Sequence, residues 1–404
     1  MHYVGIDWAD EKHHVAVLNA EGKCVSEFGV QENGKGFSLF QEHLARLAPV
    51  EINIERPDGL LVDWLVMQGY AVYVTPPRVV ASQRPRSSKD DRNDARLLAN
   101  LRRTQNEDCR PLVRHSPAVQ ELLQLLRAFE QFQRQQLRVT NQLRQVLKHY
   151  YPVMLHLFSD INIDIALTFL QTYPTPQVAQ GLTRAELEAF LRSQGYNHMR
   201  RLDELYQRLQ APMPTAAVWQ GYQQHVQWLV PVIQLLNQQL TALRREINHC
   251  FTQHPEAAWW RTLPGAGELT APRLLALMGD NRAAFPSCAA LQALAGTVPV
   301  TRQSGKHKTV QFRWACVKAL RKAMMDFARN SLSNSGWARS YYYDQLERGH
   351  DQQQATRALA NRWIRIIWTL WQRHDSYDET RHVANRARNG KAAVVIPAIA
   401  AASR

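Results

Sequence analysis

The run His2-Tyr-Val-Gly-Ile-Asp7 near the N-terminus is a short apolar strand that ends on a carboxylate. A second strand-like run, His14-Val-Ala-Val-Leu18, follows it, and the turn residues Asn19-Ala-Glu-Gly22 lead into a third run over Val25–Val30. Strand-like runs separated by short turns predict that the chain begins with three consecutive strands.

Helices and strands alternate along the next segment. The spacing of apolar residues predicts, in order, a helix at Gly36–Leu47, a strand at Glu51–Glu55, a helix at Leu60–Gln68, a strand at Tyr70–Val74 and a helix at Asp91–Arg103. Three consecutive strands followed by this alternation is the order of a ribonuclease-H-like fold. We therefore expect an α/β domain over residues 1–110.

The charge of the chain indicates the class of its partner. The 404 residues include 49 Lys and Arg against 35 Asp and Glu, which gives a net charge of +14 at pH 7. An excess of this size favours a polyanion, most simply nucleic acid, because each neutralised phosphate releases counterions. A basic protein without such a partner is the alternative. Apolar residues make up 45% of the chain, which excludes a disordered polymer.

Cysteine usage and hydropathy indicate the compartment. The N-terminus opens directly into a strand, and no apolar run reaches the ~20 residues needed to span a bilayer, so we expect neither a signal peptide nor a membrane helix. The five cysteines are scattered and form no CxxC pair, which fits reduced thiols in a cytoplasmic protein without zinc. They are Cys24, Cys109, Cys250, Cys288 and Cys316.

Acidic residues stand at equivalent places in the predicted α/β domain. Asp7 and Glu55 end the first and fourth strands, and Asp91 and Asp94 share one face at the start of a helix. Strand ends gather at one edge of a sheet, where four carboxylates would repel one another without a hard cation such as Mg²⁺ or Mn²⁺. Spacing alone also allows an ordinary strand-end acid and helix-start charges favoured by the macrodipole.

The middle of the chain, residues 111–255, holds two heptad seams. The first has a polar centre and the second is apolar throughout, with Pro231 kinking the second helix or marking its start. We expect a coiled-coil arm or a dimer interface; two core helices of a bundle are the alternative. A helical insertion over about 152–215 contains a predicted capping box at Thr183–Glu186. The seam residues are Leu122, Leu126, Phe129, Gln133, Gln136, Thr140, Leu143, Leu147 and Tyr150, then Val226, Leu229, Ile233, Leu236, Leu240, Leu243 and Ile247.

Residues 256–380 predict a helical domain, and residues 381–404 a basic, mobile tail. The turn Leu263-Pro-Gly-Ala-Gly267 has glycines, Gly265 and Gly267, that would let backbone amides approach a phosphate, although a plain turn between helices fits equally well. The expected helices are Leu269–Met278, Ser287–Ala295, Thr309–Ser331 and Gln352–Arg373.

Three motifs in the α/β domain resemble those of insertion-sequence family one-ten, the IS110 family of transposases. They are Tyr3-Val-Gly-Ile-Asp7-Trp-Ala, Ile52-Asn-Ile-Glu55 and Lys89-Asp-Asp91-Arg-Asn-Asp94-Ala-Arg96. The resemblance implies a RuvC-like domain whose DEDD metal site, with Mg²⁺ or Mn²⁺ bound, is formed by Asp7, Glu55, Asp91 and Asp94. The chain departs from the family after its glutamate, where Arg56-Pro-Asp-Gly59 replaces a run of small residues.

Motifs in residues 256–380 match the second domain of the same family. They are Leu263–Gly267, Leu294-Ala-Gly-Thr-Val-Pro299, Gln303-Ser304-Gly305 and Leu320-Arg321. The resemblance implies that Ser304 is a nucleophile that forms a phosphoserine link to DNA. Basic residues that could hold the phosphate surround it in sequence: Arg302, Lys306, His307, Lys308 and Arg313. Without the resemblance, a basic loop that merely grips phosphate is the other interpretation.

The resemblance further implies a DNA recombinase guided by a structured non-coding RNA that pairs with donor and target DNA. It implies a dimer in which Ser304 of one subunit works beside the carboxylates of another, and a tetramer for strand exchange. Two basic stretches fit nucleic-acid tracking, or are solvated faces. One is Arg84–Lys89 with Arg92 and Arg96; the other is Arg134, Arg138, Arg144 and Lys148. Two rival hypotheses are a metal-dependent junction nuclease that hydrolyses DNA and a non-catalytic RNA-binding scaffold.

Overall fold

The structure is a computed structural model that describes residues 1–84, 91–105, 107–112, 114–212, 219–304 and 307–388. The chain divides into two compact units, Met1–Arg114 and His115–Arg404, and each is considered by itself. No helix in the described residues is both long and apolar enough to cross a membrane.

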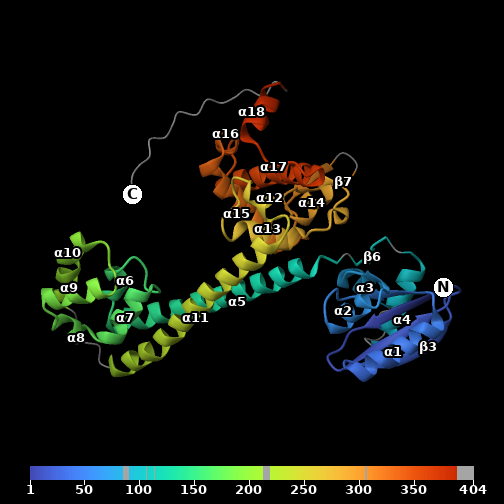
Figure 1. Cartoon of the computed structure of the whole chain (residues 1–404), viewed down its shortest axis with the longest axis horizontal. Helices are drawn as coiled ribbons and strands as arrows, with labels where there is room; N and C mark the ends of the chain where they lie inside the picture. The colour runs from blue at the N-terminus through green and yellow to red at the C-terminus, as the bar shows by residue number, and fades with distance from the viewer. Residues whose placement is uncertain (85–90, 106, 113, 213–218, 305–306, 389–404) are drawn as a thin grey trace. The chain divides into compact units, whose positions relative to one another are not determined.

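A six-stranded sheet forms the centre of the first unit (Figure 1). Its order is β3-β2-β1-β4-β5-β6; β1, β2 and β3 pair antiparallel, β4 and β5 continue parallel to β1, and β6 is antiparallel. The strands are β1 (His2–Asp7), β2 (Lys12–Leu18), β3 (Cys24–Gln31), β4 (Val50–Ile54), β5 (Ala71–Val74) and β6 (Arg110–Pro111). This mixed sheet confirms the predicted α/β domain.

Helices cover both faces of this sheet. The side chains of each strand alternate between the two faces, so each face presents apolar residues that a helix can bury. On one face, α1 (Gly34–Leu47) and α2 (Leu60–Met67) bury apolar residues against Ile6 and Ile54. On the other face lies α4 (Asp91–Arg103), which α3 (Pro77–Gln83) precedes in the chain. The predicted bounds of α4 are confirmed.

The helix α4 crosses β1 at a glycine. A methyl group built on Gly5 would lie 1.9 Å from the carbonyl oxygen of Ala95 and 2.4 Å from the amide nitrogen of Ala99. Only glycine therefore allows this close approach. The buried amide Nδ2 of Asn53 in β4 also donates to the carbonyl of Leu98, at 2.8 Å. These contacts fix the depth at which α4 lies on the sheet.

The direction of α4 follows from an ion pair at its last turn. The guanidinium Nε of Arg102 lies 2.7 Å from Oε2 of Glu51, near the start of β4. The C-terminal end of α4 therefore lies at the beginnings of β1 and β4. Its N-terminal turn lies at their ends, where Asp7 and Glu55 are.

Two long helices of the second unit, α5 (Pro117–Tyr150) and α11 (Trp219–Gln253), run antiparallel beside each other (Figure 1). The thiol of Cys250 contacts the carbonyl of Ala118, and the amides of Gln136 and Asn237 are hydrogen-bonded at the polar centre of the first seam. Because α11 is continuous through Pro231, the expectation that a helix begins there is wrong. Supercoiling of this pair stays a prediction.

In the described part of the insertion, five short α-helices pack against one end of this pair. Their core includes Leu147 of α5 and Ile233 of α11, and the capping box of Thr183 and Glu186 is confirmed. The helices are α6 (Met154–Leu157), α7 (Asp164–Thr172), α8 (Pro176–Gln180), α9 (Arg184–Ser193) and α10 (Leu202–Gln210).

A mostly helical domain packs against the other end of the pair, around the buried rings of Trp260, Trp363 and Trp371. Two antiparallel strands lie at Val300–Ser304 and His307–Gln311, so the predicted helix at Thr309–Ser331 is wrong in its first turns. The predicted mobile tail is helical up to Arg388. The elements are α12 (Ala257–Arg261), α13 (Thr270–Met278), α14 (Cys288–Leu294), β7 (Val300–Ser304), β8 (His307–Gln311), α15 (Lys318–Asn334), α16 (Gly336–Glu347), α17 (Gln352–Arg373) and α18 (Glu379–Arg388).

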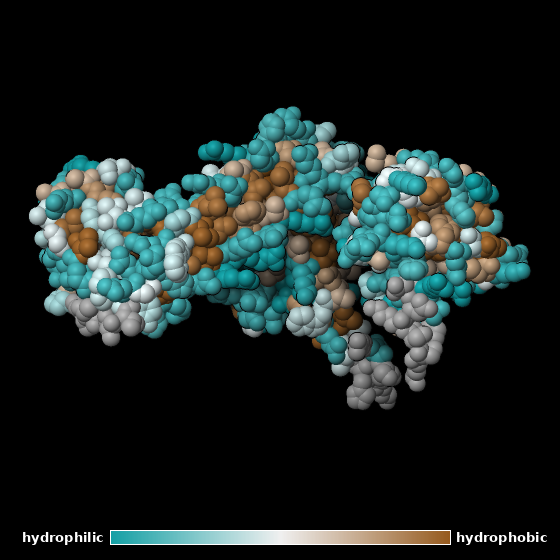
Figure 2. Space-filling model, turned by 90° about the horizontal axis from the view of Figure 1, so that it is seen from below, coloured by the Kyte–Doolittle hydropathy of each residue, from teal (hydrophilic) through white to brown (hydrophobic). Residues whose placement is uncertain are grey.

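Apolar side chains on α11 also reach the surface, and Figure 2 shows hydrophobic surface along the helical pair. Trp228, Val232 and Leu235 are 66%, 44% and 55% exposed. They are four and three residues apart and so follow one side of the helix. This stripe is separate from the seam that α11 buries against α5.

Candidate active site

Asp7 and Glu55 are brought together by the register of the sheet. The parallel strands β1 and β4 pair Ile6 with Ile54, so the two acids follow this pair on neighbouring strands, which lie about 4.8 Å apart. Gly5 and Asn53, two residues earlier, face α4. By alternation, the two acids project on the side of the sheet that α4 covers.

Asp94 reaches the same edge from the first turns of α4. It is buried, with 3% of its surface exposed, and it accepts a hydrogen bond of 2.6 Å from Nε of Arg84 to its Oδ1. The Nη2 group of Arg84 contacts its second oxygen. This hydrogen bonding raises the pKa of Arg84 against the opposing effect of burial, and the charges of Glu55 and Asp7 raise it further. Of the four predicted acids, Asp94 thus contacts this guanidinium, and Glu55 and Asp7 act on it through their charge.

The fourth acid, Asp91, is the first residue of α4, one turn before Asp94. Its position puts its backbone near the same edge, but its side chain lies outside the described structure. No three His, Cys, Asp or Glu side chains in the described part of the chain are close enough together to hold a metal ion. The donors predicted for this edge are all carboxylate oxygens, and such a set suits a hard divalent cation.

The loop that departs from the family pattern lies beside this edge. The guanidinium carbon of Arg56 lies 4.0 Å from the centroid of the Trp8 ring, and Nε of Arg56 lies 3.7 Å from Asp58. Gly59 ends the loop with φ of +119° and begins α2, a conformation that favours glycine. In this loop, where the sequence departs from the family pattern, Arg56 therefore stacks on Trp8, the residue after Asp7.

Ser304 is the last residue of β7, and its backbone pairs with that of His307 at the start of β8. The serine therefore lies where the hairpin turns, a position that the sequence interpretation missed because it assigned Thr309 to a helix. Gly305 and Lys306 lie outside the described residues, as do the side chains of Ser304 and of Arg302, His307 and Lys308.

The predicted phosphate-binding residues that can be placed have different roles. Gly265 packs tightly, because a methyl group on it would lie 2.3 Å from the carbonyl oxygen of Phe327. Gly267 faces open space, and its carbonyl accepts from the amides of Thr270 and Ala271 at the start of α13. Nε of Arg313 donates to the carbonyl of Val298 at 3.2 Å. Close packing explains Gly265, and the backbone amide of Gly267 already donates to the carbonyl of Gly265 at 3.1 Å, so contact of this turn with a phosphate stays a prediction.

The basic stretches are partly neutralised within the protein. Arg96 pairs with Glu27, with 2.8 Å between Nη2 and Oε2, and Arg84 pairs with Asp94, so neither is a simple phosphate ligand. Arg92 is exposed on α4, and Lys89 lies outside the described residues. The ion pair of Arg84 with Asp94 is the feature of this site that sequence reasoning missed.

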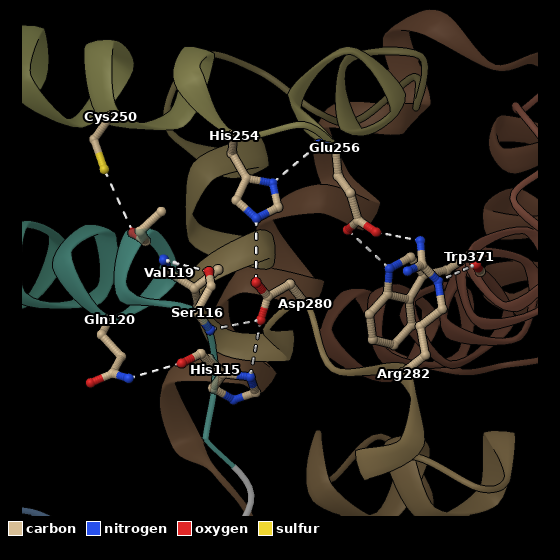
Figure 3. A network of polar contacts seen from close by, with 11 residues as sticks. His115, Ser116, Val119, Gln120, Cys250, His254, Glu256, Asp280, Arg282 and Trp371 are labelled. Atoms are coloured by element: carbon tan, nitrogen blue, oxygen red, sulfur yellow. Dashed lines mark hydrogen bonds and ion pairs between the residues drawn. The ribbon is translucent and has the colours of Figure 1, made fainter. Parts of the chain in front are cut away.

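A second polar cluster lies at the start of α5 (Figure 3). Asp280 accepts a hydrogen bond of 3.1 Å from the backbone amide of Ser116, and Nδ1 of His115 and Nε2 of His254 lie 3.7 and 3.6 Å from its oxygens. A methyl group on Gly279, whose φ is +77°, would lie 1.9 Å from the ring of His115. The cluster ties the start of α5 to the ends of α11 and α13, so its role is structural.

Comparisons with known proteins bear on both units. A family model described as "Transposase" matches residues 4–152, and one described as "Transposase IS116/IS110/IS902 family" matches residues 258–343. The chain is 30% identical to the "Mini-circle putative transposase for IS117" of Streptomyces coelicolor, across 95% of this chain and 96% of that protein. It is 24% identical to the "Insertion element IS110 uncharacterized 43.6 kDa protein" of the same organism, across 91% of this chain and 93% of that protein.

These matches cover the elements that carry the acids and the hairpin that carries Ser304. The first family is of the DEDD type, which implies use of a divalent metal ion, and a transposase domain implies DNA as the partner. The identity to a full-length relative extends across nearly the whole of both chains. The chain therefore belongs to the IS110 family of transposases.

Proposed function

We propose that this chain is an RNA-guided DNA recombinase of an insertion sequence, which cleaves and rejoins donor and target DNA through a phosphoserine intermediate. The observation that supports this most is that Asp7 and Glu55 follow paired residues of neighbouring strands, at the edge where Asp94 pairs with Arg84 and where the charges of Asp7 and Glu55 also act on that guanidinium. Carboxylates are gathered in this way where a cation is to be bound. Asp91 would complete the set of ligands for Mg²⁺ or Mn²⁺.

The reaction balances without an external energy source. The hydroxyl oxygen of Ser304 attacks a phosphorus atom of the DNA backbone, a Ser–O–P bond forms, and the P–O bond to the departing DNA hydroxyl breaks. The proton of Ser304 ends on that hydroxyl. Attack by a hydroxyl of the second DNA strand reverses these steps and frees the serine. The phosphodiester bond energy is conserved throughout, so no ATP is needed.

The protein groups have separate roles in this proposal. A divalent cation held by the acids would stabilise the charge that develops on the phosphate oxygens. Asp7, Glu55, Asp91 and Asp94 bind and orient that cation, while basic residues around the hairpin, including Arg313, hold the phosphate. Rigid placement of the acids follows from Gly5 and Asn53, which fix α4 against the sheet.

The proposed partners are double-stranded donor and target DNA, a structured guide RNA and further copies of this chain. The net charge of +14 supports binding to nucleic acids. In a guided complex, base pairing reads the sequence, while the protein contacts backbone and shape. The exposed stripe of Trp228, Val232 and Leu235 supports a homo-oligomer, a dimer at least, with a tetramer in strand exchange. In that assembly, Ser304 of one subunit acts beside the carboxylates of another.

The test is a denaturing gel for a covalent protein–DNA adduct. The full chain is incubated with Mg²⁺, RNA transcribed from the ends of the element and supercoiled DNA. We expect an adduct with the unaltered protein, and neither adduct nor cleavage with Ser304→Ala. Asp94→Asn should lose both as well.

Each rival function predicts another result. Cleavage by Ser304→Ala without an adduct would identify a junction nuclease that hydrolyses DNA. Binding and activity that Asp7→Ala and Asp91→Asn leave unchanged would identify a non-catalytic RNA-binding scaffold. An adduct that forms without RNA would remove the guided part of the proposal and keep the serine chemistry.

A further inference from the structure

An exposed tryptophan lies between the hairpin and α15. Trp314 has 76% of its surface exposed, although tryptophan buries a large apolar area in most folded proteins. Its ring packs edge-on against Phe312, with 4.8 Å between centroids and 70° between the ring planes. The indole is thus supported by a neighbouring ring while most of its surface is open to a partner.

Positively charged side chains pack on the Phe312 ring that supports this indole. The guanidinium carbons of Arg321 in α15 and Arg357 in α17 lie 4.3 and 4.7 Å from the centroid of the Phe312 ring. In the described part of the chain, neither arginine forms an ion pair with a carboxylate. Residues 281–325 contain eight Lys or Arg and no Asp or Glu. Arg282 of this segment pairs with Glu256, whereas Arg321 and Arg357 beside Phe312 are complementary to an anion.

An open indole beside uncompensated guanidinium groups matches the chemistry of a nucleotide. A base offers a π-face for the indole, and its phosphates offer charge for the arginines; stacking of this kind contributes about 1–3 kcal/mol per base. In a duplex, each base is already stacked between its neighbours. Trp314 can therefore stack only on a base that is unpaired or at the end of a stack.

We propose that Trp314 is a stacking platform for an unpaired nucleic-acid base, with Arg321 and Arg357 holding the adjacent phosphates. The inference rests on the proposed function, because exchange of strands leaves bases unpaired next to the break. It also adds to that function, because it assigns recognition of melted nucleic acid to a surface that follows the hairpin of Ser304 in the chain.

The experiment compares binding of the full chain to a single-stranded DNA oligonucleotide and to a blunt duplex that contains the same sequence, by fluorescence anisotropy. We expect Trp314→Ala to weaken binding to the single strand about 5- to 150-fold, the equivalent of 1–3 kcal/mol. Binding to the duplex should change less than about twofold. Trp314→Phe should retain most of the single-strand affinity, because its ring still stacks.

Two further variants separate stacking from charge. Tyr343→Ala is the matched control, because Tyr343 is 51% exposed on α16 but has Asp344 as its neighbour in sequence. It should leave both affinities unchanged. Arg357→Gln should weaken binding to the single strand and to the duplex alike. The slope of the logarithm of the binding constant against the logarithm of the salt concentration should become shallower by about one, the effect of losing one phosphate contact.

Three results would overturn the proposal. One is equal weakening of single strand and duplex by Trp314→Ala, and another is no weakening of either. The third is a change in the oligomeric state of Trp314→Ala with DNA affinity intact, which would show that a second copy of the chain covers the indole. Because these are binding measurements, they can succeed even where no Ser304 adduct forms, so failure of the proposed chemistry is distinguishable from failure of this inference.

Discussion

Arg84 and Asp94 form a two-point ion pair, in which Nε of the guanidinium lies 2.6 Å from one carboxylate oxygen and Nη2 contacts the other. Asp94 is buried, whereas the side chain of Arg84 is 30% exposed. Both oxygens of the acid are thus occupied by an internal cation. A metal ion that binds to Asp94 must therefore share these oxygens with Arg84 or displace it, and the two cations repel each other.

The first prediction concerns competition between Arg84 and the metal. Arg84→Gln removes the internal cation, so we expect Mg²⁺ and Mn²⁺ to bind about fivefold more tightly, the equivalent of about 1 kcal/mol for one partly exposed ion pair. The metal-free variant should also unfold at a lower temperature, because its acids have lost their counterion. Isothermal titration calorimetry and thermal unfolding measure the two effects.

Arg96→Gln is the control for that experiment, because Arg96 also lies on the first unit but pairs with Glu27, away from the three acids. It should leave metal affinity unchanged. Weaker metal binding by Arg84→Gln would contradict the prediction and would show that Arg84 positions Asp94 for the ion.

The second prediction concerns Gly5. Gly5→Ala places a methyl group against the backbone of α4, 1.9 Å from the carbonyl oxygen of Ala95, so the helix must move. We expect a loss of about 3 kcal/mol or more in the free energy of unfolding of the first unit. Gly34→Ala, with open space around the new methyl group, should change it little. Denaturant unfolding measures the free energy of unfolding of both variants. Similar values for Gly5→Ala and Gly34→Ala would contradict the prediction and show that α4 lies further from β1.

The third prediction is a pH dependence. Burial lowers the pKa of His115, and the charge of Asp280 only partly offsets this effect. Because the pKa of the ring is lower in the folded than in the unfolded state, its contribution to stability is present above the unfolded value of about 6.5. It is lost as the pH falls below that value. The melting temperature should therefore fall between pH 7.5 and 5.5.

His115→Gln removes the titrating group and should make this fall smaller. Part of the fall should remain, because burial also lowers the pKa of His13 in the first unit. Differential scanning fluorimetry at both pH values measures the difference. Parallel curves for the variant and the unaltered protein would show that His115 takes no part in the pH dependence.

The fourth prediction concerns the stripe on α11. Val232→Glu combined with Leu235→Glu puts two charges on a surface that the proposed homo-oligomer would bury, and desolvating unpaired charges is costly. We expect a lower molar mass in light scattering and an unchanged far-ultraviolet circular dichroism spectrum. Gln234→Glu, on the same helix outside the stripe, is the control and should keep the mass of the unaltered chain. Unchanged mass in the double variant would place the interface elsewhere.

Local patterns predicted the first unit well. The strand runs and the helix at Asp91–Arg103 were confirmed, since each is set by residues near one another in sequence. The pairing of Ile6 with Ile54 then brings Asp7 and Glu55 together, as expected of parallel strand ends. The contact of Arg84 with Asp94 could not be predicted, because a basic run gives no sign of which arginine turns inward.

The hairpin of β7 and β8 shows a second limit of structure prediction from local sequence. Its strands are five residues long, and the apolar residues that follow Thr309 also fit the start of a helix. Short strands owe their stability to cross-strand pairing rather than to local preference. The predicted helix at Thr309–Ser331 therefore began inside β8, where the backbone of Thr309 pairs with that of Arg302.

The division into two units at Arg114 has a consequence for incomplete copies of the gene. Each unit closes its own apolar core, so a chain that stops after Arg114 retains every residue of the first core. Such a fragment would keep Asp7, Glu55, Asp91 and Asp94 but lack Ser304. Under the proposed mechanism, a fragment expressed beside the intact protein would compete for shared partners without contributing the nucleophile, and a damaged insertion element would thereby restrain its active relatives.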